Sequence, residues 1–386
     1  MNDRELSQLL HLLHEPTAPF REMHVARLAM DTLRHAKIPF FLDPAGNIVI
    51  GAASLADYKR LLREPAREPL RVFVAHMDHP GFHGVRWLSP QRLQVRWHGG
   101  APVRGLNRTP VWLADDHGYV GLGRLVRPRL DKTRKRLLEA QIEVERAIWR
   151  AHPPAESLFG GFRAHAPVWR EGKLLYTKAA DDLVGVFAAL RTAREIFRGN
   201  KKRRPPFIGL LTRGEEVGFI GMLAHLEQGW LARAKRSVVC VSLETSRTLP
   251  GAEIGKGPVV RLGDRRTVFD PAYLRVLSEV AEATLPGKHQ RRIMDGGTCE
   301  ATAALAYELP AIGISVPLGN YHNESFEGRT RGTPAPEYVH IDDVAGVLKL
   351  CEALMRPGLT WNNPWEKTRR ALRANFRKQR LLLTRK

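Results

Sequence analysis

Two kinds of apolar pattern alternate along the chain. In several segments apolar residues recur every third or fourth position, as in Leu6, Leu9, Leu10 and Leu13, which predicts amphipathic helices. In others, apolar residues follow one another directly between Pro, Gly or charged residues, which is typical of buried strands. The predicted helices cover residues 5–14, 21–35, 180–196, 219–231, 271–283, 299–307 and 342–355. The predicted strands cover residues 70–75, 207–211, 237–244 and 311–316.

The order of these segments predicts an α/β fold. Short apolar strands alternate with helices, which favours a mixed, largely parallel sheet with helices on both of its faces. A hairpin is expected near the start, because the strand-like segments 39–42 and 47–50 flank the turn sequence Asp43-Pro44-Ala45-Gly46.

Residues 84–170 have a different texture. Short alternating stretches, such as 92–97 and 110–113, are separated by Gly-Gly and Asp-Asp-His-Gly turns, which predicts a small β-rich unit. A basic amphipathic stretch, Leu130–Trp149, interrupts this unit. We therefore expect three parts: a discontinuous α/β domain of residues 1–83 and 171–357, an inserted β-rich domain of residues 84–170, and a basic tail of residues 358–386.

The chain is strongly basic. Its 386 residues include 61 Lys and Arg against 40 Asp and Glu, a net charge of +21. The excess is concentrated in residues 124–150 and after Glu366. Such an excess can bind nucleic acid or another anionic partner. A solvated basic helix explains both regions equally well, so nucleic acid is only a secondary expectation.

The rest of the composition is typical of a globular cytoplasmic protein. Hydrophobic residues make up 43% of the chain and charged residues 26%. Three widely spaced cysteines argue against a disulfide framework. No apolar run approaches the length of a membrane-spanning helix, and the first residues, Met1–Leu6, lack the apolar region of a signal peptide. We expect no membrane partner.

Metal-binding residue types cluster at the ends of the predicted strands and at the start of one helix. They are His76, Asp78, Asp181, Glu215, Glu216, Glu244 and His322. Ligands of α/β sheets bind outside the carboxyl ends of the strands, so these side chains are expected to converge. Histidines and carboxylates without cysteine are the donors of a hydrolytic zinc site.

The adjacent carboxylates Glu215 and Glu216 lie at the centre of this pattern. Neighbouring side chains at a strand end point in different directions, so one can bind a metal while the other faces a reacting water. Alone, the pair is better explained as surface residues at a helix start, where the helix dipole favours acids. The other residues at strand ends favour the metal site.

At these residues the chain resembles the dinuclear zinc aminopeptidases that form tetrahedral (TET) assemblies, including the glutamyl and deblocking aminopeptidases. The matching motifs keep their order over nearly the whole chain: His76-Met77-Asp78-His79-Pro80-Gly81-Phe82, Ala180-Asp181-Asp182-Leu183-Val184-Gly185, Gly214-Glu215-Glu216-Val217-Gly218, Lys256-Gly257-Pro258-Val259, Gly296-Gly297-Thr298 and Tyr321-His322-Asn323-Glu324. The early insertion is shared with the aspartyl aminopeptidases. The related deacylase/carboxypeptidase branch is expected to carry its extra domain after the Glu-Glu motif.

The resemblance implies an enzyme that removes N-terminal residues from peptides with two divalent metal ions, zinc or alternatively cobalt. Asp181 would bridge the two metals. His76 and Glu244 would complete one site, and Glu216 and His322 the other. The inserted domain would mediate assembly into a homo-oligomer.

Two further roles follow from the same resemblance. Asp78 would orient His76 through the ring nitrogen that does not face the metal. Glu215 would be the general base, taking a proton from the metal-bridging water and returning it to the leaving amine.

The chain departs from the family pattern at three places. Glu244 stands where these aminopeptidases usually carry Asp, and Glu is more familiar in the deacylase/carboxypeptidase branch. Cys299-Glu300 stands where Asp-Ala is expected, and residues 245–253 lack a histidine-containing continuation. Two alternatives therefore stay open: a same-fold zinc deacylase or carboxypeptidase-type amidase, and a non-catalytic protein that binds RNA or another anionic partner.

Overall fold

A computed structural model describes residues 1–198 and 205–383. Within these residues the central element is an eight-stranded sheet. Its strands run in the order β1 (Phe40–Leu42), β2 (Ile48–Ile50), β12 (Phe207–Thr212), β3 (Leu70–His76), β13 (Val238–Arg247), β16 (Ala311–Leu318), β14 (Val259–Asp264) and β15 (Gln290–Met294). The neighbours β12, β3, β13 and β16 are parallel, whereas β14 pairs antiparallel with β16. The mixed, largely parallel sheet and the β1–β2 hairpin are confirmed.

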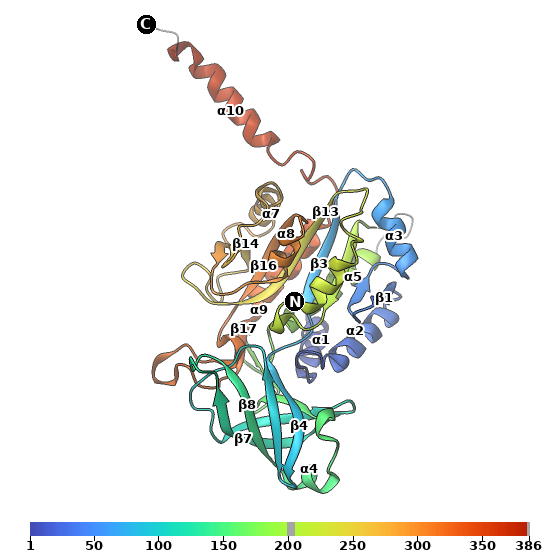
Figure 1. Ribbon diagram of the computed structural model, residues 1–386. Coiled ribbons are helices and arrows are strands. Elements are labelled where there is room, and N and C mark those ends of the chain that lie inside the picture. The colour runs from blue at the N-terminus through green and yellow to red at the C-terminus, as the bar shows by residue number, and fades with distance from the viewer. Residues whose placement is uncertain (199–204, 384–386) are drawn as a thin grey trace.

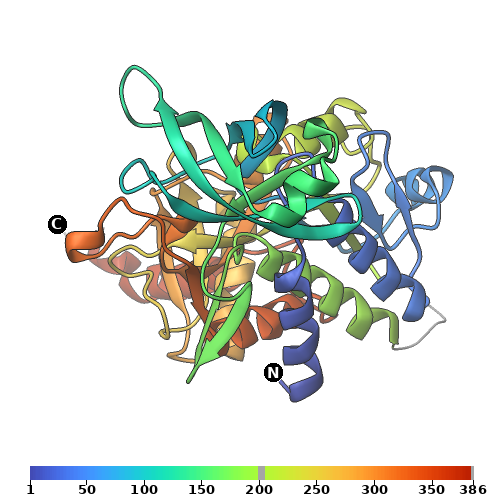
Figure 2. The same cartoon turned by 90° about the horizontal axis from the view of Figure 1, so that it is seen from below.

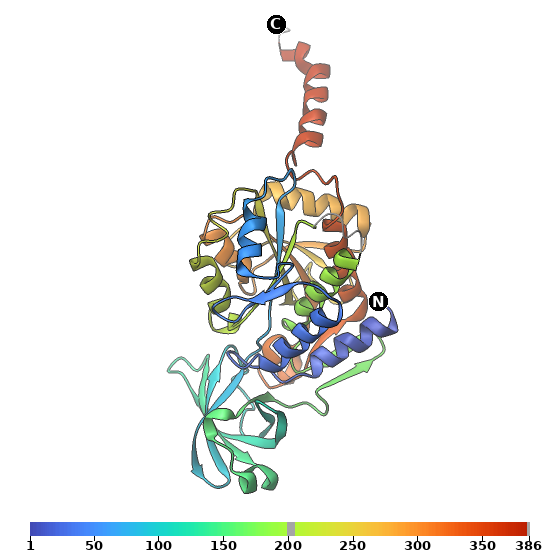
Figure 3. The same ribbon diagram turned by 90° about the vertical axis from the view of Figure 1, so that its right-hand side faces the viewer.

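Helices cover both faces of this sheet (Figures 1 and 3). They are α1 (Asp3–His14), α2 (Met23–His35), α3 (Leu55–Arg63), α5 (Leu183–Arg198), α6 (Ile220–Glu227), α7 (Pro271–Thr284), α8 (Glu300–Ala306) and α9 (Ile341–Leu354). α5 packs on β3 and β13, with α1 and α9 against it, and α8 packs on β13 and β16 beside α6. Two helix boundaries differ from the prediction by three residues or more. α6 ends at Glu227, and α5 begins only at Leu183 because the preceding residues form a loop.

The inserted region is a closed barrel (Figure 2). Its strands run in the order β4 (Gly81–Ser89), β5 (Arg92–His98), β8 (Leu137–Val144), β7 (Gly118–Leu130), β6 (Thr109–Asp115) and β9 (Phe159–Phe162). Its own apolar core includes Phe82, Leu93, Val95, Leu113 and Ile142. The barrel follows β3 directly and lies below the carboxyl ends of the parallel strands (Figure 1).

The interpretation of Leu130–Trp149 as a basic amphipathic interruption was wrong. Leu137–Val144 is a barrel strand, and it is followed by the short helix α4 (Arg146–Ala151). Ala140, Ile142 and Val144 face the barrel core, while the intervening Gln141 and Glu143 are less buried. The segment thus has the two-residue period of a strand.

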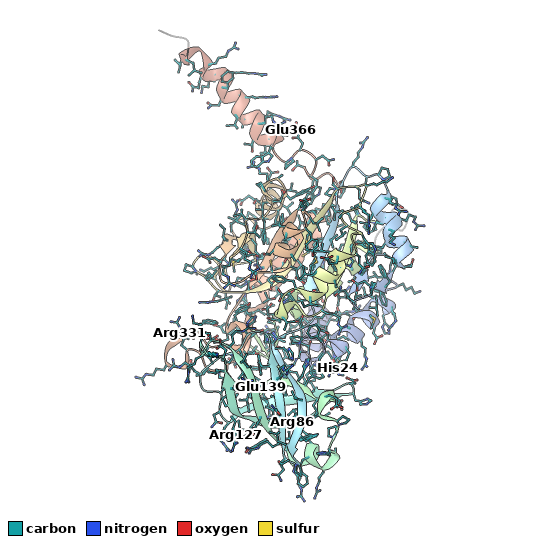
Figure 4. The ribbon with its side chains drawn as sticks, viewed as in Figure 1. His24, Arg86, Arg127, Glu139, Arg331 and Glu366 are labelled. Carbon is teal, nitrogen blue, oxygen red and sulfur yellow. The ribbon has the colours of Figure 1, made fainter. Side chains whose placement is uncertain are left out.

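Hydrogen bonds to the first helices and the loop between them help to fix the barrel to the α/β domain. The ring of His24 in α2 lies within hydrogen-bond distance of the Asp115 carbonyl oxygen, with Nε2 at 2.7 Å, and Figure 4 labels this histidine at the junction. The Tyr119 hydroxyl donates to the His14 carbonyl at 2.6 Å. A three-stranded antiparallel sheet, β10 (Val168–Glu171), β11 (Leu174–Thr177) and β17 (Glu337–His340), follows the barrel.

The basic tail contains the helix α10 (Glu366–Gln379) and a 3-10 turn at Arg380–Leu383. α10 extends away from the α/β domain at the end opposite the barrel (Figures 1 and 3). The last residues of the predicted tail, 384–386, lie outside the described residues. Among the described helices, none has both the length and the apolar character needed to span a bilayer.

Candidate metal centre and cleft

The predicted site residues converge at the carboxyl ends of the parallel strands. His76 is the last residue of β3, and Glu244 lies in the second half of β13. The 3-10 turn Glu215–Val217 follows β12, and a second 3-10 turn, Tyr321–Asn323, follows β16. Asp181 lies in the loop just before α5.

Asp181 lies between the two histidines. Its Oδ1 is 3.4 Å from His76 Nε2, and its Oδ2 is 3.7 Å from His322 Nε2. Glu244 Oε1 lies 3.7 Å from His76 Nε2, and Glu216 Oε2 lies 3.0 Å from His322 Nε2. Of the possible donor groups among the described residues, two share Asp181: His76, Asp181 and Glu244, and Asp181, Glu216 and His322.

Several donor atoms in these groups are buried without a hydrogen-bond partner among the described residues. They include Asp181 Oδ1, Glu216 Oε1 and His322 Nε2. Buried polar atoms are normally hydrogen-bonded, so unpartnered donor atoms that face one another fit a cation between them. The imidazole and carboxylate donors and their sharing of one aspartate fit two divalent metal ions.

The charges of the site point the same way. Burial raises the pKa of Asp181, Glu215 and Glu216 well above the ordinary carboxyl values, and the Glu244 carboxylate raises each further. Burial and the nearby His76 lower the pKa of His322 to about 3, so this ring is neutral, the form that binds metals. Divalent cations would offset the repulsion between these buried carboxylates and stabilise their charged forms.

The turn that carries Glu215 and Glu216 is held by Asp78. The Asp78 carboxylate accepts hydrogen bonds from the backbone N–H groups of Glu215 at 2.9 Å and Glu216 at 3.1 Å. The Asp78 carbonyl oxygen lies 3.1 Å from His76 Nδ1, closer than its carboxylate, whose Oδ1 is 3.6 Å away. Asp78 thus contacts the ring nitrogen predicted from the sequence, mainly through its backbone, and its carboxylate has a second task that the sequence did not suggest.

Glu22 holds the other side of the same turn. This buried carboxylate accepts a hydrogen bond from the Gly214 N–H at 3.0 Å and another from Arg213 Nε at 2.9 Å. Gly214 has a φ of 60°, a conformation that favours glycine. The direction of the Glu215 side chain therefore depends on contacts with a residue near the N-terminus.

Glu337 in β17 joins the two loops that carry Asp181 and His322. Its Oε2 accepts the backbone N–H groups of Ala180 at 2.7 Å and Asp181 at 3.1 Å, and its Oε1 accepts that of His322 at 2.9 Å. Glu337 was not among the residues singled out from the sequence. Nothing in its local pattern marks it, since its partners lie more than a hundred positions away or across a loop.

Replacing Glu337 by glutamine is expected to weaken metal binding by roughly tenfold to a hundredfold, as for other supports of metal ligands. In glutamine only one of these two positions is an oxygen that can accept a hydrogen bond. The other is an NH2 group, which would face a backbone N–H donor and lose that hydrogen bond. Competition with a chromophoric chelator measures this affinity. Glu327→Gln, an exposed carboxylate between His322 and Glu337, is the matched control and should bind metal normally. Equal affinities in the two variants would show that Glu337 does not position the ligands.

A neighbouring histidine and a glycine complete the surroundings of His322. The His79 ring lies within hydrogen-bond distance of the Asp181 carbonyl oxygen, at 2.6 Å, and of Asn323 Oδ1, at 3.0 Å. In the barrel, Gly100 lies so close to His322 that a Cβ there would be 2.0 Å from Nδ1. The barrel thus closes one side of the metal centre, and only glycine fits at that point.

The departure at Cys299-Glu300 leaves a carboxylate beneath the site. Glu300 is fully buried and accepts a hydrogen bond from the Thr212 hydroxyl at the end of β12. Burial raises the pKa of Glu300 to about 7. The acid expected at position 299 is thus present one residue later, on the first turn of α8.

A cleft of about 560 Å³ opens onto Glu215, Glu216 and His322. Its other walls come from the loop Gly296–Thr298, from Tyr321 and from the exposed Arg265 and Arg266. Glu215 and members of one of the two donor groups therefore lie on the wall of this cleft.

Solved structures of aminopeptidases share this fold. Pyrococcus horikoshii TET1 peptidase, described as able to assemble into a tetrahedron or a large octahedral shell, matches with a TM-score of 0.69 and 21% identity, over 92% of this chain and 100% of its own. The aminopeptidase APDkam598 from the archaeon Desulfurococcus kamchatkensis matches with a TM-score of 0.72 and 19% identity, over 94% of this chain and 98% of its own. An M18-family aminopeptidase from Thermotoga maritima matches with a TM-score of 0.62 and 13% identity, over 91% of this chain and 95% of its own.

The family itself is shown by the sequence. The family model for the M42 glutamyl aminopeptidases matches residues 61–328, more than half of the chain, and this range includes the barrel and all the predicted site residues. The protein therefore belongs to the M42 glutamyl aminopeptidase family and is a metallo-aminopeptidase.

Proposed function

We propose that the chain binds two divalent metal ions through five side chains and hydrolyses peptides at the residue with a free amino terminus. The observation that carries this proposal is the position of Asp181, whose two carboxylate oxygens face two separate donor groups. His76 and Glu244 would bind one metal with Asp181, and Glu216 and His322 the other. Zinc suits these donors, with cobalt as an alternative.

Each donor group contains three protein side chains, which is fewer than a closed site needs, so water and substrate have room to bind. When bound, such a pair of cations lowers the pKa of a water molecule and polarises the scissile carbonyl. Glu215 would take the proton from that water and deliver it to the leaving amine. Its carboxylate lies at the cleft, with Oε2 3.8 Å from His76 Nε2.

The structure offers a third donor group, formed by His76, Glu215 and Glu216. In that arrangement Glu215 would bind metal and no base would remain beside it. We favour Glu215 as the base, because Asp181 already presents one oxygen to each of the two histidines. Both metal sites can then be formed without the Glu215 carboxylate.

We also propose that the enzyme is a homo-oligomer assembled through the barrel. The barrel has its own core and lies outside the α/β domain, so it can contact other copies without disturbing the sheet. The TET1 peptidase, which shares this fold, can assemble into a tetrahedron or a large octahedral shell.

Removal and return of metal tests the central proposal. Treatment with a chelator should abolish hydrolysis of a peptide with a free amino terminus, and zinc or cobalt should restore it. Elemental analysis should then find two metal ions per chain. The His322→Ala variant should retain one, because it disrupts only the group that contains Glu216. Full activity in chelated, metal-free protein would contradict the proposal.

A further inference from the structure

The helix α10 has no role in the metal centre. None of its side chains is buried, and it extends beyond the α/β domain at the end opposite the barrel (Figures 1 and 3). Trp365, just before the helix, has the Arg275 guanidinium of α7 5.9 Å from its ring centre, and its side chain is still 42% exposed. A helix of this length is marginal in water without packing, so α10 has the properties of a docking element.

Exposed apolar side chains are concentrated on this segment. Among the described residues, many of the large apolar side chains that face solvent belong to it: Trp365, Leu372, Phe376, Leu382 and Leu383. Leu372 is 65% exposed and Phe376 57%. Trp365, Leu372 and Phe376 are spaced by seven and then four residues, so they form one stripe along the helix.

The rest of the helix surface is cationic. Its basic residues, all exposed, are Lys367, Arg369, Arg370, Arg373, Arg377 and Lys378. Its one acid, Glu366, already pairs with Arg370 at 2.9 Å. The helix therefore combines a narrow apolar stripe of aromatic and aliphatic side chains with a large excess of positive charge.

We propose that α10 binds an anionic lipid surface, lying in the membrane interface with Trp365, Leu372 and Phe376 buried among the acyl chains. An amphipathic helix with Lys and Arg on one face and Trp, Phe and Leu on the other has this property. Anionic headgroups match its charge. The sequence predicted no membrane partner because the chain lacks an apolar run long enough to span a bilayer. A helix that lies in the membrane interface does not need such a run.

Two other occupants fit the surface less well. Nucleic acid would neutralise the arginines but leave the stripe of Leu372 and Phe376 in water. A second copy of the chain is disfavoured by charge. Nine of the 61 Lys and Arg and one of the 40 Asp and Glu lie after Pro364, which leaves 52 basic against 39 acidic residues before it. The remainder of the chain is therefore also basic and would repel the helix. In the bound orientation the barrel would face away from the lipid (Figure 1).

Co-sedimentation of the full-length, metal-loaded protein with vesicles tests the proposal. Vesicles that contain phosphatidylglycerol should pellet the protein, and vesicles of phosphatidylcholine alone should not. The double variant Leu372→Ser/Phe376→Ser should bind at least about tenfold more weakly, because it removes the two apolar side chains that the lipid would bury. Arg373→Gln/Arg377→Gln should weaken binding by roughly tenfold or more and reduce its dependence on salt.

The matched control is Ala371→Ser/Ala374→Ser, which adds the same hydroxyls outside the apolar stripe and should bind as the unmodified protein does. Peptidase activity should be unchanged in all these variants, since α10 contributes no residue to the cleft. Equal binding to neutral vesicles, or unchanged binding by Leu372→Ser/Phe376→Ser, would overturn the proposal. Retention on heparin without any binding to vesicles would also overturn it and assign the helix to a polyanion.

Discussion

Replacement of Glu215 by glutamine is expected to lower kcat by roughly a hundredfold to ten-thousandfold, the usual contribution of a general base, while both metal ions stay bound. Glutamine has the same shape but cannot take the proton of the attacking water. The turn should survive the change, because Asp78 and Glu22 hold it through backbone N–H groups rather than through the Glu215 side chain. Steady-state kinetics and elemental analysis of the same preparation measure the two effects.

The adjacent variant, Glu216→Gln, is the matched control. Glu216 Oε2 lies 3.0 Å from His322 Nε2, so this change should release or weaken one metal ion as well as reduce activity. Loss of metal from Glu215→Gln would assign Glu215 to the third donor group, with His76 and Glu216. A near-normal kcat in Glu215→Gln would show that another group is the base.

The sequence predicted those parts of the fold in which burial creates a regular pattern. β3, β12, β13 and β16 are buried on both faces, so each contains an apolar run of four residues or more, which in β3 begins after Arg71. β14 and β15 were missed because their sequences contain several arginines, one of which, Arg261, is buried. Edge positions and buried charges remove the apolar signal on which such a prediction depends.

For the site, the residue types and the strand ends were sufficient to bring all seven predicted side chains into one region. The supporting residues Glu22 and Glu337 were not predictable in the same way. Glu22 accepts one backbone N–H from the loop after β12, and Glu337 accepts three from two other loops, and such contacts depend mainly on the fold. His79 belongs to the motif of residues 76–82, but its contacts with the Asp181 carbonyl oxygen and with Asn323 depend on the fold and could not be predicted from that motif.

The unusual Glu244 has a partner that accounts for its extra length. Its Oε1 faces His76, while its Oε2 lies 3.8 Å from the buried Arg261 guanidinium. Arg261 also donates to the Ser246 hydroxyl at 2.9 Å. An aspartate here would be one methylene shorter and could not keep both contacts, so Glu244 and Arg261 form a local unit. This arrangement explains the departure from the usual aspartate without changing the class of reaction.

The same feature gives the prediction that best separates an aminopeptidase from a deacylase. A peptide with a free amino terminus should be cleaved about a hundredfold faster, or more, than the same peptide with an acetylated terminus. The ammonium group of the free peptide would pair with a carboxylate of the metal centre. The acetylated peptide has no such charge and would leave that buried carboxylate unpaired, which costs about 3 kcal/mol, or about a hundredfold in kcat/KM. Both peptides should be assayed as kcat/KM with zinc or cobalt present.

Glu244→Asp provides the control for this comparison. If Glu244 only positions a metal beside the substrate amine, the shorter side chain should slow cleavage of the free peptide by up to about a hundredfold, the cost of a displacement near 1 Å. It should not create activity on the acetylated peptide. Faster cleavage of the acetylated peptide by the unmodified enzyme would contradict the requirement for a free amino terminus and would favour the deacylase, in which a glutamate at this position is familiar.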